Sequence, residues 1–277
     1  MLKPIFDSFL KEKDTSGNKT ATLHKACENG YLALIRELLI EDPNLIRKAT
    51  EKDGYTVLHS ACEGGHLEVV EELLRIDPNL IHKATKDGFT ALHQACFKGH
   101  LEVFQKLVTE KPELIYEAQK NGLTVLHAAC LGGHLEVVNE LLGKDRNLID
   151  KATKNGFTVF HSACEGGHLE VVEELFNRQP GLLNKATNNN ETPIFKACLG
   201  GHKDVVKFLF NNDADTSYLT KTSLLGDKVI RNRLKKILNP EMNALINEIT
   251  QLNTSTTGTL FTAPKLRSGF LCQPCAL

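Results

Sequence analysis

The sequence predicts an all-α solenoid, in which small helical units stack side by side along one axis. Residues of fixed type recur every 34 residues in six copies, which together span residues 18–215. Each copy contains two short helical patterns separated by glycine. A unit of this size cannot bury its apolar face alone, so the units must stack. The recurring residues include His59, His93, His127 and His161; Cys62, Cys96, Cys130, Cys164 and Cys198; and Gly65, Gly99, Gly133, Gly167 and Gly201.

The third copy illustrates how each unit begins. "KDGFTALH" (86–93) contains Asp-Gly, which is a turn signal, followed by Thr90 as a candidate helix N-cap. Residues 90–99 then carry small and apolar side chains and predict a short helix. Gly99 stands at the C-terminal end of this pattern, where glycine commonly ends a helix.

A second, amphipathic helix follows in each copy. In the third copy, residues 100–110 have apolar side chains at helical spacing, and Pro112 stops the pattern. Residues 113–122 are predicted to be a loop that leads to the next turn. The first copy is one residue longer than the others because of an insertion in "ATEKDG" (49–54).

The segments outside the repeats are predicted to be caps and a tail. Residues 1–17 carry apolar residues at helical spacing and are predicted to cap the first repeat. Residues 216–253 are predicted to form a helical C-terminal cap, with a basic face over 223–239. We interpret this face as solvated, with an acidic or phosphate partner as the alternative. Residues 254–277 are rich in Ser, Thr, Gly and Pro and are predicted to be disordered.

Composition and charge argue against several classes of protein. Lys and Arg total 33 and Asp and Glu total 34, which gives no electrostatic case for nucleic acid or an anionic membrane as the main partner. We expect neither a transmembrane span nor a signal peptide, because no apolar run is long enough. Six of the eight cysteines recur at one repeat position, which favours a reducing, intracellular setting over a secreted disulfide scaffold.

"DGYTVLHSACEGGHLEVVEELL" (53–74) resembles the ankyrin repeat, in which Asp-Gly-x-Thr-Pro-Leu-His precedes Ala-Ala, Gly-His and a Val/Leu-rich helix. The resemblance extends over all six copies. It implies an ankyrin-repeat solenoid of helix-turn-helix units with β-hairpin-like loops, in which the Leu-His histidine fixes the loop through backbone hydrogen bonds. The usual proline appears only as Pro193, and the last copy has Asn190 for Gly and Phe195 for His. Irregular end copies are expected where outer faces meet water.

"ACEGGHLEVVEELL" (61–74) collects residue types that bind metals and move protons. A zinc site needs about four converging ligands, but a Gly-Gly turn separates Cys62 from His66. Because both recur in register, we interpret the cysteine as a small buried residue and the histidine as the start of the second helix. Three glutamates are predicted to lie on the solvated face of that helix: Glu68, Glu71 and Glu72. Without a nucleotide-binding or catalytic motif, the sequence predicts no enzyme activity, cofactor or metal.

"CQPC" (272–275) is the remaining reactive pattern and lies in the tail. A redox Cys-x-x-Cys normally starts a helix in a packed fold, and a prenylation box needs cysteine where the chain has Pro274. We interpret the pattern as part of an exposed tail, with palmitoylation of Cys272 or Cys275 as the alternative.

Residues that break the repetition indicate where a partner binds. The resemblance implies a concave face lined by two positions of each copy: the tip residue after Asp/Asn-Gly and the residue after Ala-Cys. Apolar residues at these positions in the central copies, with acidic residues beside them, are an interface signal. The alternative is that they pack on neighbouring hairpins. The predicted partner-binding residues are Tyr55, Phe89, Leu123 and Phe157 at the tips, and Glu63, Phe97, Leu131 and Glu165 after Ala-Cys.

The sequence therefore predicts a monomeric, cytoplasmic and non-catalytic scaffold or adaptor that binds a protein partner through its concave face. The alternative function is a host-directed effector of an intracellular bacterium, delivered into the host cell. In that case the repeats select the target, and the segment after residue 215 carries a secretion or localisation signal.

Overall fold

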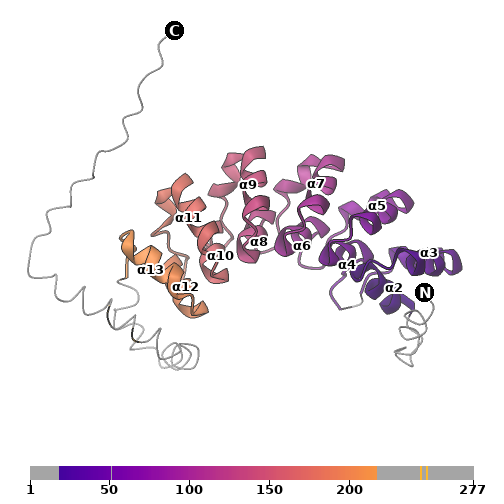
Figure 1. Ribbon diagram of the computed structural model, residues 1–277, viewed down its shortest axis with the longest axis horizontal. Coiled ribbons are helices and arrows are strands. Elements are labelled where there is room, and N and C mark those ends of the chain that lie inside the picture. The colour runs from indigo at the N-terminus through magenta and orange to yellow at the C-terminus, as the bar shows by residue number, and fades with distance from the viewer. Residues whose placement is uncertain (1–18, 51, 217–243, 245–247, 249–277) are drawn as a thin grey trace, which may run out of the picture.

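The chain forms a curved stack of helix pairs, which Figure 1 shows from the side. The computed structural model describes residues 19–50, 52–216, 244 and 248. Within these residues the first helix of each pair lies in an inner, concave row and the second in an outer row. The inner helices are α2 (Lys19–Glu28), α4 (Val57–Gly64), α6 (Ala91–Lys98), α8 (Val125–Gly132), α10 (Val159–Gly166) and α12 (Pro193–Gly200). The outer helices are α3 (Leu32–Glu41), α5 (Leu67–Ile76), α7 (Leu101–Glu110), α9 (Leu135–Lys144), α11 (Leu169–Arg178) and α13 (Lys203–Asn211).

The predicted all-α solenoid is confirmed. Each inner helix packs on the inner helices before and after it, as α6 does on α4 and α8. The outer helices contact their neighbours in the same order, as α7 does with α5 and α9. In the part of the chain that the structure describes, β pairing occurs only as isolated bridges in the loops, such as Ala84 with Thr90.

Each loop begins with a short 3-10 helix, which the sequence prediction missed. The stretch predicted as loop over 113–122 starts inside η3 (Pro112–Tyr116). A similar 3-10 helix follows every outer helix from α3 to α11. Proline sets the helical φ of the first residue, and the Leu-Ile pair that follows, Leu114 and Ile115, is buried. The other 3-10 helices are η1 (Pro43–Arg47), η2 (Pro78–His82), η4 (Arg146–Asp150) and η5 (Pro180–Leu182).

The turn inside each of the first five helix pairs depends on a glycine and on a histidine from the next repeat. Gly99 follows α6 with φ of +76°, in the left-handed region that residues with a Cβ avoid. A Cβ there would overlap the ring of His134, which precedes α9 and whose Nε2 lies 3.0 Å from the Phe97 carbonyl oxygen. The same stacking joins Gly30 to His66, Gly65 to His100, Gly133 to His168 and Gly167 to His202. The histidine that precedes each outer helix from α5 to α13 therefore holds two repeats together.

The core is a continuous apolar layer between the two rows of helices. All six cysteines of the repeats, Cys27, Cys62, Cys96, Cys130, Cys164 and Cys198, are fully buried, which confirms them as small core residues. Each outer helix is buried over more of its surface than its apolar stripe predicts. In α5, Val69 is buried beside Val70, because the helix packs on α4 below it and on α7 beside it.

Glu72 corrects the prediction that the glutamates of α5 share one solvated face. Glu68 and Glu71 are exposed, but Glu72 is only 9% exposed. Its two carboxylate oxygens accept from Arg36 of the preceding repeat at 2.8 Å and from Arg75 at 2.9 Å. The hydrogen bonds from these guanidinium groups lower the pKa of Glu72 to about 2, so this carboxylate is ionised at neutral pH.

The predicted caps and tail, at 1–17, 216–253 and 254–277, fall almost wholly outside the described residues and stay predictions. The basic face over 223–239, Cys272 and Cys275 also lie outside the described residues, so their interpretations stay predictions. Among the described residues, none of the helices is long and apolar enough to cross a membrane.

We expect Gly99→Ala to destabilise the stack strongly. Left-handed φ alone costs an alanine about 1–2 kcal/mol, and the new Cβ would also displace the ring of His134. Chemical denaturation followed by circular dichroism would measure the loss of unfolding free energy.

Two other glycines provide matched controls. Gly201 has nearly the same φ but no atom within 4 Å of a new Cβ, so Gly201→Ala should show the backbone cost without the overlap. Gly143 lies within α9 in open space, and Gly143→Ala should stabilise the protein by about 1 kcal/mol. Equal losses for Gly99→Ala and Gly201→Ala would contradict a role for the histidine stack.

Candidate functional site

The tips of the loops are built by backbone bonds within a repeat and between repeats. In the third copy, Thr85 N–H donates to the Phe89 carbonyl at 2.8 Å, and Phe89 N–H donates to Thr85 Oγ1 at 3.0 Å. Gly88 supplies the positive φ that closes this turn. Lys86 N–H also donates to the Asp53 carbonyl of the preceding tip at 2.9 Å. Each tip is therefore fixed in itself and joined to its neighbour.

A buried histidine links the start of each inner helix to the next tip. In the third copy, the Thr90 backbone N–H donates to His93 Nδ1 at 3.3 Å, and the Thr90 hydroxyl lies 2.8 Å from the same nitrogen. His93 Nε2 lies 3.3 Å from the Leu123 carbonyl oxygen of the next repeat. Because a carbonyl can only accept, the ring carries its proton on Nε2 and accepts at Nδ1. The role that the resemblance implied for this histidine is therefore confirmed.

The same link recurs in the second, fourth and fifth copies. The Nε2 atoms of His59, His127 and His161 lie 3.0–3.1 Å from the carbonyl oxygens of Phe89, Phe157 and Glu191, respectively. Burial lowers the pKa of His59, His93, His127 and His161 to about 4. In the sixth copy Phe195 replaces the histidine, and the Thr192 hydroxyl is buried without a hydrogen-bond partner among the described residues.

The aromatic residues at the tips lie against these histidines. The Phe89 ring centroid is 5.4 Å from that of His93, and the Tyr55 centroid is 4.8 Å from that of His59. Phe157 lies in the same way beside His161, at 5.1 Å. Tyr55, Phe89 and Phe157 are consequently half-buried, and the fourth tip residue, Leu123, is half-buried as well. Each tip ring presents one part of its surface to solvent and packs the other on its own repeat.

Phe97 and Leu131 are the most exposed of the large apolar residues in the inner row. Each is 37% exposed at the end of an inner helix, and the two occupy the same position in consecutive repeats. Their backbone is fixed, because the carbonyl oxygens of Phe97 and Leu131 each lie 3.0 Å from the Nε2 of the histidine in the following repeat. α6 and α8 pack directly on each other. The structure thus brings the two predicted side chains to adjacent positions on the concave row.

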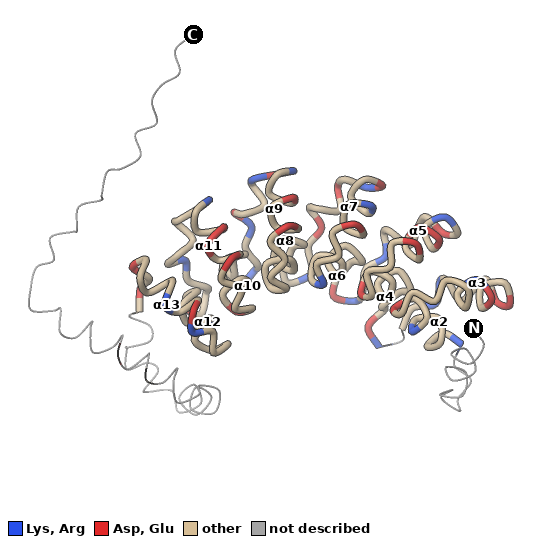
Figure 2. Tube along the Cα trace, in the orientation of Figure 1, with Lys and Arg blue, Asp and Glu red and all other residues tan. Residues whose placement is uncertain are grey.

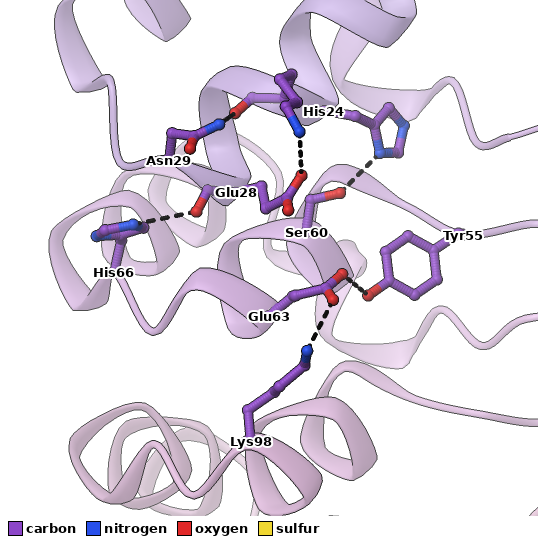
Figure 3. Close-up of polar contacts among 9 residues, drawn as sticks. His24, Glu28, Asn29, Tyr55, Ser60, Glu63, His66 and Lys98 are labelled. Atoms are coloured by element: carbon purple, nitrogen blue, oxygen red, sulfur yellow. Dashed lines mark hydrogen bonds and ion pairs between the residues drawn. The ribbon is translucent and has the colours of Figure 1, made fainter.

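Glu63 occupies the same position in the preceding repeat and is held by two neighbours, as Figure 3 shows. The Tyr55 hydroxyl donates to one carboxylate oxygen of Glu63 at 3.0 Å, and Lys98 Nζ lies 3.0 Å from the other. On the other side of the pair, Glu165 is exposed and has no ion pair with a described residue. The predicted acidic flanks therefore differ: one is neutralised by a lysine and the other is open to a partner.

Two lysines belong to this face that the sequence prediction did not include. Lys98 replaces the glycine found at this position in the neighbouring copies, which is the signal that could have drawn attention to it. Lys196 lies 2.7 Å from the Glu191 carboxylate and 5.5 Å from the centroid of the Phe157 ring. Figure 2 shows acidic and basic residues interspersed along the described repeats.

The cysteines and histidines are poorly placed for metal binding or nucleophilic chemistry. Across residues 19–50 and 52–216, no group of three or more His, Cys, Asp or Glu side chains converges in a way that could hold a metal ion. Burial raises the pKa of the Cys198 thiol to about 12 and that of the Cys62 thiol further still. The thiolate is the form that binds metals and attacks substrates, so these buried thiols are unreactive at neutral pH.

Comparison with known families identifies the repeats. A model described as ankyrin repeats, three copies long, matches residues 3–82, 23–116, 76–150 and 126–220. These overlapping matches cover more than half of the chain. A comparison with curated proteins finds no match.

Acidification should weaken the repeats before the carboxylates titrate. The four linking histidines have a pKa of about 4 in the folded protein and about 6.5 when unfolded. Between these values the unfolded chain binds more protons, so the unfolding free energy must fall as pH decreases from 6.5 towards 4. Each histidine contributes a slope of up to about 1.4 kcal/mol per pH unit. Urea denaturation at intervals from pH 7.5 to 5 would measure this slope.

A variant that lacks one titrating ring provides the control. His93→Gln should lower stability at pH 7, because the buried link to Leu123 is lost, but its stability should depend less steeply on pH. A slope as steep as that of the unmodified protein would show that His93 does not contribute to the pH dependence.

Proposed function

The chain belongs to the ankyrin-repeat family, and we propose that it is a non-catalytic scaffold or adaptor that binds a protein partner through its concave face. Ankyrin repeats generally mediate protein–protein interaction, and the family is typically non-catalytic. The observation that carries the proposal is the exposure of Phe97 and Leu131 side by side on consecutive inner helices. Exposed apolar side chains on a rigid surface are typical of residues that anchor a partner.

The surroundings of this pair suggest the chemistry of the partner. The half-buried tips of the same two repeats, Phe89 and Leu123, extend the apolar area, and Glu63 and Glu165 border it. Because Lys98 already pairs with Glu63, Glu165 is the better contact for a cationic side chain. The partner is therefore expected to present an apolar anchor with a basic residue beside it.

The rigidity of the face supports binding without large rearrangement. Each central inner helix is tied to the next repeat at both ends, by His93 at the start of α6 and by the Phe97 carbonyl at its end. A preformed surface loses little conformational entropy when a partner binds. The six free thiols in the core also suit the reducing, cytoplasmic setting that the proposal assumes.

The alternative function, a bacterial effector directed at a host cell, depends on a signal in the segment after residue 215, which lies almost wholly outside the described residues. No described residue favours it over a scaffold or adaptor. Monomeric state likewise stays a prediction.

We expect Phe97→Ala combined with Leu131→Ala to reduce partner binding by about one to two orders of magnitude. Truncation of a buried interface anchor typically costs about 1 kcal/mol or more of binding free energy. A cost of about 1.4 kcal/mol corresponds to a tenfold loss of affinity. Quantitative affinity capture from cells, with the full chain as bait, would compare the variant with the unmodified protein. Both residues are partly exposed, so thermal stability should change little.

Tyr116→Ala is a suitable control, since Tyr116 is 57% exposed and lies on η3, which is not one of the inner helices. Its captured partners should match those of the unmodified protein. If the double variant captures every partner as efficiently as the control, the concave apolar pair is not the binding site.

A further inference from the structure

An apolar groove lies in the outer row, between α3 and α5. It has a volume of about 560 Å³ and is lined by four apolar residues, Leu39, Ile40, Pro43 and Ile76, and by three charged residues, Arg36, Glu72 and Arg75. Ile40 is 82% exposed and Ile76 is 41% exposed. Ile40 is the most exposed of the large apolar residues that the structure describes. The size lies within the range of about 300–1,000 Å³ that is typical of binding pockets.

The two isoleucines break the repetition, as the concave pair does. Ile40 is the ninth residue of its outer helix, and the equivalent residues in the next four repeats are Arg75, Thr109, Gly143 and Asn177. Ile76 is the tenth residue, and its equivalents are Glu41, Glu110, Lys144 and Arg178. Repeat architecture does not require an apolar side chain at either position, because the other copies fold with polar residues or glycine there.

The charged side of the groove carries an excess of positive charge. Glu72 is shared by Arg36 and Arg75, and both arginines donate to it through Nε. The side chains of Arg36 and Arg75 remain 55% and 70% exposed, whereas that of Glu72 is 11% exposed. One carboxylate thus serves two guanidinium groups, whose outer N–H donors face solvent. Two of the carboxylates nearby are already paired, Glu41 with Lys19 and Asp77 with Arg47.

We propose that this groove is a second binding site, which takes an apolar–acidic segment of a protein partner. An aliphatic side chain of the segment lies between Ile40 and Ile76, and a carboxylate beside it binds the outer N–H groups of Arg36 and Arg75. Arginine recognises carboxylates with paired hydrogen bonds, which provides the specificity. The site excludes a basic segment by charge, and it disfavours a fully apolar one, which would cover the outer N–H groups of Arg36 and Arg75 without supplying an acceptor.

The charge of the groove also argues against a second copy of this chain as the occupant. A symmetric dimer centred on the groove would place the same patch on both partners. Arg36 and Arg75 of one copy would then face those of the other, and like charges across an interface are unfavourable.

The groove lies apart from the concave face, so the two sites can be tested separately. Its lining comes from α3, α5 and the first residue of η1, whereas Phe97 and Leu131 belong to α6 and α8 in the inner row (Figures 1 and 2). A scaffold with both sites can hold two segments at once, either from one partner or from two.

Selection from a random twelve-residue peptide library displayed on phage would test the site. The full chain and its Ile40→Ser/Ile76→Ser variant would be used as parallel targets. We expect a set of peptides to be enriched at least tenfold on the unmodified chain relative to the variant, with an aliphatic residue within three positions of Asp or Glu. Phe97→Ala/Leu131→Ala should retain these peptides, which separates this site from the concave one. Because the isoleucines are exposed, the variant should keep its helical content and unfolding temperature.

A double-mutant cycle would then test the predicted carboxylate contact. The affinity of one selected peptide should fall about five- to tenfold when its acidic residue becomes the amide, and by a similar factor with Arg75→Gln in the protein. The combined change should cost little more than either alone. The proposal would be overturned by peptides whose enrichment does not depend on Ile40 and Ile76, or by selected peptides that lack an acidic residue. It would also be overturned if the affinity losses of the peptide change and of Arg75→Gln multiplied when the two were combined. A dimer in light scattering that Ile40→Ser/Ile76→Ser converts to a monomer would overturn it as well, because the groove would then bind a second copy.

Discussion

The link from a buried histidine to the next repeat is the interaction on which the described repeats depend. His93 accepts at Nδ1 from the Thr90 N–H and donates from Nε2 to the Leu123 carbonyl. One neutral ring thus caps an inner helix, fixes the tip of the following loop and packs against the aromatic tip of its own repeat. Both ring nitrogens are in use, so protonation would remove the acceptor that Thr90 requires. Stability, tip geometry and sensitivity to pH therefore have a common origin.

The second histidine of the repeat acts at the opposite end of the inner helix. His134 stacks on Gly99 and reaches the Phe97 carbonyl, so that α6 is tied to the following repeat at its end as well as at its start. Because both ends of the helix are fixed, equivalent side chains on the inner row have nearly the same placement in each repeat. Cooperation between neighbours of this kind is general in repeat proteins. Because the backbone of the repeats is fixed in this way, substitution of single exposed residues can change a binding surface without changing the fold.

Both proposed binding sites consist of residues that differ between otherwise similar copies. Phe97 and Leu131 stand where three other repeats have glutamate and the last has Leu199, and Ile40 and Ile76 stand where other outer helices have polar residues or glycine. The charged neighbours differ as well, with carboxylates beside the concave pair and arginines beside the groove. The two faces are therefore suited to segments of opposite charge, which would allow one stack to distinguish two contacts.

The sequence by itself determined the number and order of the repeats, the helix pairs, the glycine turns and the buried cysteines, because each of these contacts is made again at every interface and leaves a periodic trace. It also indicated that Phe97 and Leu131 differ from the glutamates at the equivalent position of three other copies. Only the tertiary structure decided contacts that occur once. Glu72 is buried because Arg36 reaches it from the preceding repeat, and Tyr55 is tied to Glu63, which also pairs with Lys98 of the following repeat. The groove between Ile40 and Ile76 arises in the same way, from side chains of two neighbouring outer helices that differ from their equivalents in other copies. Periodicity records what all the interfaces share, whereas a single contact depends on which two side chains meet across one interface.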